Sequence, residues 1–136
     1  MAWQDPYLDP ATGLLRNLLG ITDANQLAQV EATYTRRRTA QLRRRPIPGA
    51  FDLAHLQTVH RHITQDLVVW AGELRTVDIS KGNAFCLVSN LHSYADEVFG
   101  RLAHDQWLRG RDRTSFVDGL TTLYADVNAL HLYRSK

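Results

Sequence analysis

The spacing of the apolar residues changes abruptly at Arg75, and this change limits the folds that the chain can adopt. Before that point apolar residues recur every three or four positions, as on one face of a helix. From Val77 to Leu87 they alternate with polar residues across a turn signal, Lys81-Gly82-Asn83, which predicts a β-hairpin over 75–88. An isolated hairpin is marginally stable in water, so we expect it to pack on helices or to act as a mobile flap.

Helix-starting and helix-stopping residues predict two helices before the hairpin. Residues 1–21 contain two prolines and two glycines and are expected to form an N-terminal arm. Thr22 is a candidate N-cap for the first helix, which must end before Pro46. The second helix is expected over 52–67, with Asp52 as its N-cap.

Helical spacing returns after the hairpin and predicts two more helices, over 89–108 and 114–130. Thr114 is the candidate N-cap of the last one. The third helix is expected to bury one face formed by Leu91, Tyr94, Val98 and Leu102. The fourth is expected to bury a stripe formed by Phe116, Leu120, Leu123, Tyr124, Val127 and Leu130. The predicted fold is therefore mainly α with one β-hairpin.

Length and composition fit a single domain over 1–136. The chain has 136 residues, 44% of them hydrophobic, which is enough for a core. No apolar run approaches the ~20 residues of a membrane-spanning helix, so no membrane contact is expected. Cys86 is the one cysteine and can form neither an internal disulfide nor a cysteine-rich zinc site, and a reducing cytoplasm is the expected compartment.

Six arginines lie within ten positions, Arg36-Arg37-Arg38 and Arg43-Arg44-Arg45. Such a cluster is compatible with a basic helical module that binds nucleic acid. It also fits a solvated helix end, where arginines favour the negative end of the helix dipole. The second interpretation is favoured because neither interleaved aromatic residues nor a helix-turn-helix pattern accompanies the charges.

The common catalytic and metal-binding motifs are missing. His55, His60 and His62 lie on one predicted helix, but no two of them are three or four residues apart, so they make poor ligand pairs. No glycine-rich phosphate loop and no serine nucleophile elbow occurs. No metal ligand is therefore assigned to this chain.

Three separated blocks, in the right order, are similar to the Fic family of protein adenylyltransferases. They are Phe51-Asp52-Leu53-Ala54-His55-Leu56-Gln57 with His60-Arg61-His62, then Trp70-Ala71-Gly72-Glu73-Leu74-Arg75 running on to Gly82, and finally Asn128-Ala129-Leu130-His131. The last block resembles the approach to the family's catalytic motif, which reads roughly His-Pro-Phe-x-Asp/Glu-Gly-Asn-Gly-Arg.

The resemblance implies a bacterial toxin or effector that transfers AMP from ATP, with Mg²⁺, to a Ser, Thr or Tyr hydroxyl of a target protein. His131 would be the general base that takes the proton of that hydroxyl. The hairpin would be a flap that aligns the target's backbone by strand addition. The flap residues implied in this way are Thr76, Val77, Asp78, Ile79, Ser80, Lys81, Gly82 and Phe85.

The match to the catalytic motif fails after its histidine. Leu132 replaces proline, Tyr133 replaces phenylalanine, Ser135 stands where the metal-binding acid belongs, and Lys136 stands where the first glycine belongs. We therefore expect a Fic-like bundle that is cut short within the motif, lacks the final helices and is inactive as written. One interpretation is a truncated or frameshifted product; the other is a non-catalytic relative that keeps the flap for protein binding.

Partners follow from the resemblance and from the apolar stripe of the last helix. Members of the family without an inhibitory motif in their own chain often pair with a small separate antitoxin. The spacing from Ser93 to Glu97 matches that motif, but Val98 follows, and we attribute the match to chance. Apolar surface on the last helix is expected to favour self-association. The resemblance implies a location in the bacterial cytoplasm or, for a secreted effector, in a host cell.

Overall fold

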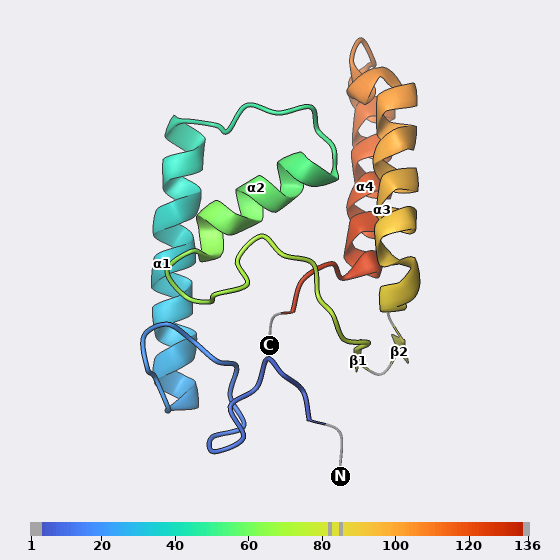
Figure 1. Ribbon diagram of the computed structural model, residues 1–136. Coiled ribbons are helices and arrows are strands. Elements are labelled where there is room, and N and C mark those ends of the chain that lie inside the picture. Colours follow the sequence, from blue (N-terminus) through green and yellow to red (C-terminus); the bar gives the residue numbers. More distant parts are fainter. Residues whose placement is uncertain (1–3, 82, 85, 135–136) are drawn as a thin grey trace. The chain divides into compact units, whose positions relative to one another are not determined.

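Helices dominate the structure, a computed structural model that describes residues 4–81, 83, 84 and 86–134 (Figure 1). Within those residues the predicted mainly α architecture is confirmed, and a hairpin is present. The elements in chain order are α1 (Ala24–Arg44), α2 (Leu53–Thr64), β1 (Ser80–Lys81), β2 (Asn83–Ala84), α3 (Val88–His104), the short 3₁₀ turn η1 (Gln106–Leu108) and α4 (Arg113–Leu130).

The chain divides into two compact units, and each is described by itself. The first combines the segments Met1–Pro48, Leu56–Glu73 and Arg134–Lys136, and the second combines Gly49–His55 with Leu74–Tyr133. None of the helices in the described part of the chain is long and apolar enough to cross a membrane.

In the first unit, α1 is capped by Asp23 rather than by the predicted Thr22. The Asp23 carboxylate accepts a hydrogen bond from the backbone N–H of Gln26 at 2.8 Å, and a carboxylate also suits the positive end of the helix dipole better than a hydroxyl does. Farther along α1, the guanidinium of Arg38 makes a two-point ion pair with Asp66, with N–O distances of 2.7 and 2.8 Å. This pair fixes α1 against the segment that follows α2.

The segment after α2 is held tightly by its own motif residues. The ring of Trp70 is buried and packs edge-on against Tyr7, with 4.8 Å between ring centroids. The backbone N–H of Gly72 donates to Nδ1 of His60 at 2.9 Å. Gly72 has a φ of +81°, and a Cβ there would lie 2.8 Å from the carbonyl oxygen of Gln57, so only glycine fits without strain. These contacts explain why tryptophan stands at position 70 and glycine at position 72.

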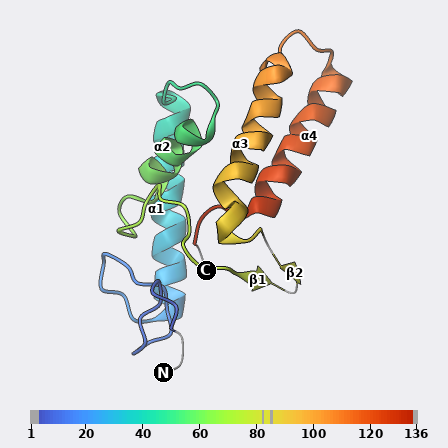
Figure 2. The same cartoon turned by 45° about the vertical axis from the view of Figure 1, so that its right-hand side comes forward.

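In the second unit, α3 and α4 lie side by side (Figure 2). Along α3 the buried residues are Leu91, Ala95 and Val98, which share one helical face. Tyr94, which was predicted on that face, is instead half exposed. Ala95 lies between the other two along this face and is fully buried.

The connection between these helices is a left-handed turn. Gln106, Trp107 and Leu108 all have φ between 54° and 63°, a region that residues with a Cβ rarely adopt. The turn buries Leu108, and a Cβ on Gly119 of α4 would come within 2.7 Å of the Leu108 side chain. The missing side chain at Gly119 therefore makes the space into which Leu108 fits.

The N-cap of α4 is Asp112, whose carboxylate accepts from the backbone N–H of Ser115 at 2.8 Å, and not the predicted Thr114. The predicted buried stripe is also wrong in large part. Leu130 is buried, but Phe116, Leu120 and Tyr124 are exposed by 43%, 47% and 74%. The apolar arc of α4 is wider than the face that α3 covers, so its outer half stays uncovered. Self-association through this face stays a prediction.

Candidate functional site

The hairpin is present but much shorter than predicted. β1 and β2 pair antiparallel, with Ser80 opposite Ala84 and Lys81 opposite Asn83, around the predicted turn. No other residue of the described 75–88 region belongs to a strand. The predicted flap residues Gly82 and Phe85 lie outside the described residues. The prediction of strands through 75–88 is therefore wrong, and the reason lies in the side chain of Arg75.

Arg75 is almost completely buried, with 2% of its surface exposed. Its Nη1 donates to the carbonyl oxygen of Val77 at 2.8 Å, and its Nη2 donates to the carbonyl oxygen of Cys86. These two carbonyls belong to opposite arms of the hairpin. The guanidinium therefore joins the arms at their base, where a regular hairpin would have backbone-to-backbone hydrogen bonds.

The same side chain also reaches the end of α4. Its Nε donates to the carbonyl oxygen of His131 at 2.6 Å, and Nη2 also donates to that of Leu130 at 3.1 Å. The backbone N–H of Arg75 donates to the carbonyl oxygen of Leu132 at 2.9 Å. Three consecutive carbonyls at the end of α4 are thus fixed by one residue.

His131, the predicted general base, is the C-cap of α4 and has left-handed backbone angles, φ 47° and ψ 64°. This conformation turns the chain away from the helix axis. Leu132, which replaces the family's proline, is buried and anchors the turn. Burial raises the pKa of the Tyr133 hydroxyl well above its ordinary value, so Tyr133 stays neutral at physiological pH.

The remaining described flap residues differ in their surroundings. Val77 is buried, Thr76 is exposed and Ile79 is half-buried. The carboxylate of Asp78 accepts a hydrogen bond from the backbone N–H of Val88, the first residue of α3, at 2.7 Å. Asp78 therefore ties the first arm of the flap to the helix that follows the second arm.

Arg134, three residues beyond His131, is held within the first unit. Its guanidinium pairs with Asp5 of the N-terminal arm, with a shortest N–O distance of 2.8 Å, and both side chains are at most 15% exposed. Its carbonyl oxygen accepts a hydrogen bond from Nε1 of Trp70 at 3.2 Å. Sequence reasoning missed this contact, because nothing in the pattern of the arm indicates which distant residue Asp5 would meet.

The histidines in the described part of the chain do not gather into a cluster with one another or with other metal-binding side chains. Burial lowers the pKa of His60 from 6.5 to about 4, so its ring is neutral at physiological pH and can accept the hydrogen bond from Gly72. His62 lies within 3.0 Å of the amide oxygen of Gln41. In the part of the chain that the structure describes, no three His, Cys, Asp or Glu side chains gather as a metal site would require.

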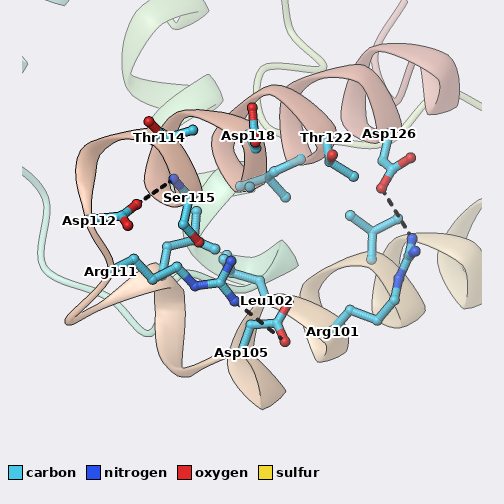
Figure 3. A pocket seen from close by; sticks show the side chains of 14 residues that line it. Arg101, Leu102, Asp105, Arg111, Asp112, Thr114, Ser115, Asp118, Thr122 and Asp126 are labelled. Atoms are coloured by element: carbon cyan, nitrogen blue, oxygen red, sulfur yellow. Dashed lines mark hydrogen bonds and ion pairs between the residues drawn. The ribbon is translucent and has the colours of Figure 1, made fainter.

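Two open pockets lie in the second unit. One, of about 520 Å³, is lined by residues of α3, the left-handed turn and the start of α4 (Figure 3). Its two arginines pair with acids, Arg101 with Asp126 at 3.2 Å and Arg111 with Asp105 at 3.8 Å. None of the predicted site residues lines this pocket. The other, of about 460 Å³, is bounded by Cys86 and Leu130 and so adjoins the segments that Arg75 joins.

The sequence is similar to several bacterial protein adenylyltransferases, although no profile of a known family matches it. It is 40% identical over 131 residues to the protein adenylyltransferase VbhT of Bartonella schoenbuchensis, covering 96% of this chain and 27% of that protein. It is 34% identical to the probable protein adenylyltransferase Fic of Escherichia coli (96% and 65% covered) and 35% identical to y4lH of Sinorhizobium fredii (98% and 69%). The chain thus spans less than two thirds of the first two of these relatives.

Solved structures show the same fold. The N-terminal Fic domain of a Bartonella quintana effector, with bound ADP, superposes with a TM-score of 0.90 at 23% identity, covering 96% of this chain and 68% of that one. The Fic domain of Bep8 from Bartonella sp. 1-1C gives a TM-score of 0.89 at 22% identity, covering 95% and 67%. The predicted Fic-like fold is therefore confirmed.

Proposed function

This chain belongs to the Fic family of protein adenylyltransferases, and we propose that it forms the part of such an enzyme that carries the general base and binds the target protein. The observation that supports this proposal best is the joint anchoring of His131 and both arms of the hairpin on one buried side chain. The proposed reaction is transfer of AMP from ATP to a hydroxyl of a protein side chain.

In the proposed step, the neutral imidazole of His131 takes the proton from the target hydroxyl. The hydroxyl oxygen forms a bond to the α-phosphorus of ATP while the bond from that phosphorus to the bridging oxygen breaks, and pyrophosphate leaves. The turn after α4 carries the imidazole at a fixed point beside the last helical turn. Since the described residues form no metal site, no step is assigned to a metal ion.

The hairpin supports the binding half of the proposal. Each strand has only two residues, so the arms leave edge N–H and carbonyl groups that a target segment can meet as an added strand. Thr76, Asp78 and Ile79 precede β1 and would form the start of that edge. Strand addition fixes the target backbone and thereby places one hydroxyl near His131.

A second candidate is a protein-binding relative that uses the flap without catalysis. It is favoured by Leu132, which departs from the family motif, and by the lack of a metal-ligand cluster among the described residues. This candidate keeps the same binding surface, and a small antitoxin is a further partner proposed for it. We place both candidates in the bacterial cytoplasm, on the support of the single cysteine.

The test is incorporation of labelled AMP from ATP into lysate proteins or into the protein itself. A polypeptide of these 136 residues alone should give no transfer, since base catalysis contributes only about 10²–10⁴-fold and most of the rate must come from holding the triphosphate. The same chain joined to an Asp/Glu-Gly-Asn-Gly-Arg continuation and its helix should transfer AMP.

In the joined chain, His131→Ala should lower the rate by about 100-fold or more. His62→Ala, which changes a histidine on α2, should leave the rate near that of the parent. Transfer by the 136 residues alone that His131→Ala abolishes would contradict the requirement for the continuation. A joined chain that folds and binds a target but never transfers AMP would favour the non-catalytic candidate.

A further inference from the structure

The structure assigns to Arg75 the role of a positioning residue that couples the flap to the turn carrying His131. This inference rests on the proposed function, because it gives His131 and the flap their roles. The inference adds that the flap and His131 are not independent of each other. One guanidinium group sets both the shape of the flap base and the conformation of the turn after α4.

The contacts of Arg75 come from three separate segments, one of which is far away in the sequence. Its side chain reaches the carbonyls of Val77 and Cys86 in the two hairpin arms, and those of Leu130 and His131, which are 55 and 56 residues away. A displacement of either arm therefore changes the hydrogen bonds available to the carbonyl of His131. No other single side chain with described contacts bridges the two arms of the flap and the end of α4.

Only arginine matches this arrangement. Its planar guanidinium carries five N–H donors in a fixed fork, which allows it to serve four carbonyls at different angles. Lysine offers three donors from a single point and cannot span the same set. Burying the cation costs desolvation free energy, so the charge by itself gives no advantage over a neutral side chain. The benefit of arginine here is therefore geometric.

The carbonyl of His131 is the contact that links this geometry to chemistry. The backbone of His131 is left-handed, a conformation that costs free energy for a residue with a Cβ and persists only where the surroundings hold it. The Nε donor of Arg75, at 2.6 Å, supplies such a hold. When it is lost, the turn relaxes and the imidazole moves relative to the target that the flap presents.

The test compares Arg75→Lys and Arg75→Met with the matched control Arg38→Lys in the full natural protein. Arg38 also makes a two-point contact, with Asp66 in the first unit, but touches neither the flap nor the turn. Amide hydrogen exchange is followed at 76–79, 86–88 and 130–134, and AMP transfer is followed as kcat, as KM for the target and as the pH dependence of kcat.

We expect Arg75→Lys to speed exchange in all three segments together, while α1 and the middle of α3 keep parent rates. Its kcat should fall by about 10–100-fold, because a displacement of the His131 imidazole by about 1 Å lowers the rate by that much. The acid limb of its pH profile should also shift. Arg38→Lys should leave exchange in these segments, kcat and the pH profile at parent values. If Arg75→Met fails to fold, the lysine variant still decides.

Parent-like exchange at 130–134 in Arg75→Lys would overturn the inference. A uniform rise in exchange over the whole second unit would also overturn it, because that result is expected when a residue is needed only for folding. Normal kcat and an unchanged pH profile would also overturn it. If the parent protein transfers no AMP but the three segments loosen together, the proposed activity fails while the coupling stands.

Discussion

Two adjacent stretches of the chain, Trp70–Arg75 and the hairpin that follows it, are held in opposite ways. The first is fixed along its length by a buried indole, a glycine in a left-handed conformation and a buried guanidinium. The second is held at its base by Arg75 and Asp78 and has only two paired residues in each strand. Buried side chains hold the first, anchored stretch, whereas the described part of the flap is held by contacts at its base.

Residues of a recognisable family motif can serve either to hold the fold or to act on a target. Trp70, Gly72 and Arg75 stand in the family's most recognisable stretch outside the catalytic loop, and in this chain all three make contacts that hold the backbone in place. The residues predicted to touch the target come after this stretch.

The largest effect is expected from Trp70→Ala, which removes the centre of the anchored stretch. It deletes the packing on Tyr7 and the hydrogen bond to the carbonyl of Arg134, and the loss should be about 3–5 kcal/mol in the free energy of unfolding. Urea denaturation measures it. Trp107→Ala, at a tryptophan that is 38% exposed, is the control and should cost much less. Equal losses would mean that the two tryptophans are held alike.

Gly72→Ala should destabilise the protein by about 2–4 kcal/mol, from the left-handed backbone and the contact of the new Cβ with Gln57. Gly100→Ala is the matched control, because Gly100 lies in α3 and a Cβ added there would meet nothing within 4 Å. That change should stabilise the helix by roughly 0.5–1 kcal/mol. A neutral Gly72→Ala would show that the anchored stretch is as adaptable as the flap.

A pH dependence should follow from His60, whose pKa is about 4 in the fold and 6.5 when unfolded. Between these values the unfolded chain binds a proton that the folded chain does not, so stability is complete above pH 6.5 and falls as the pH drops toward 4. His60→Gln should remove this part of the slope, and His62→Gln should keep it. Thermal unfolding from about pH 7 to about pH 4 measures the slopes, and equal slopes in all three proteins would contradict the assignment.

The smallest effect on stability is expected from Asp78→Ala at the base of the flap, about 1 kcal/mol for the lost hydrogen bond to Val88. Asp78→Asn keeps an oxygen acceptor and should cost less. Because this contact limits how far the first arm can move, the KM for a target protein should rise more than the stability loss alone explains. An unchanged KM in a folded Asp78→Ala protein would argue that the flap base does not restrict target binding.

Sequence reasoning found the four helices and the turn of the hairpin because these depend on local spacing and local turn chemistry. It missed the caps at Asp23 and Asp112 by one or two positions, since neighbouring polar residues are nearly equivalent candidates. It overestimated the burial of α4 because spacing shows that a face is apolar and does not show which part of that face another element covers.

Some residues of the candidate site were predicted and others were missed, because local patterns do not show long-range contacts. His131 and the flap came from resemblance, and their roles stay a prediction. Arg75 was not singled out, because a charged residue at the start of an alternating pattern is expected on the surface. Its burial depends on carbonyls more than fifty residues away, which no local pattern contains. The one available signal was its place within the Trp70–Arg75 block.

Because Arg75 binds carbonyls more than fifty residues farther along the chain, these hydrogen bonds can form only late during synthesis. Ribosomes add about 5–20 residues per second, so Arg75 is synthesised roughly 3–11 seconds before Leu130 and His131 exist. During that interval the nascent chain has its flap segment but not the acceptors that complete its base. The base of the hairpin and the turn after α4 therefore acquire their shared hydrogen bonds in one late event of synthesis.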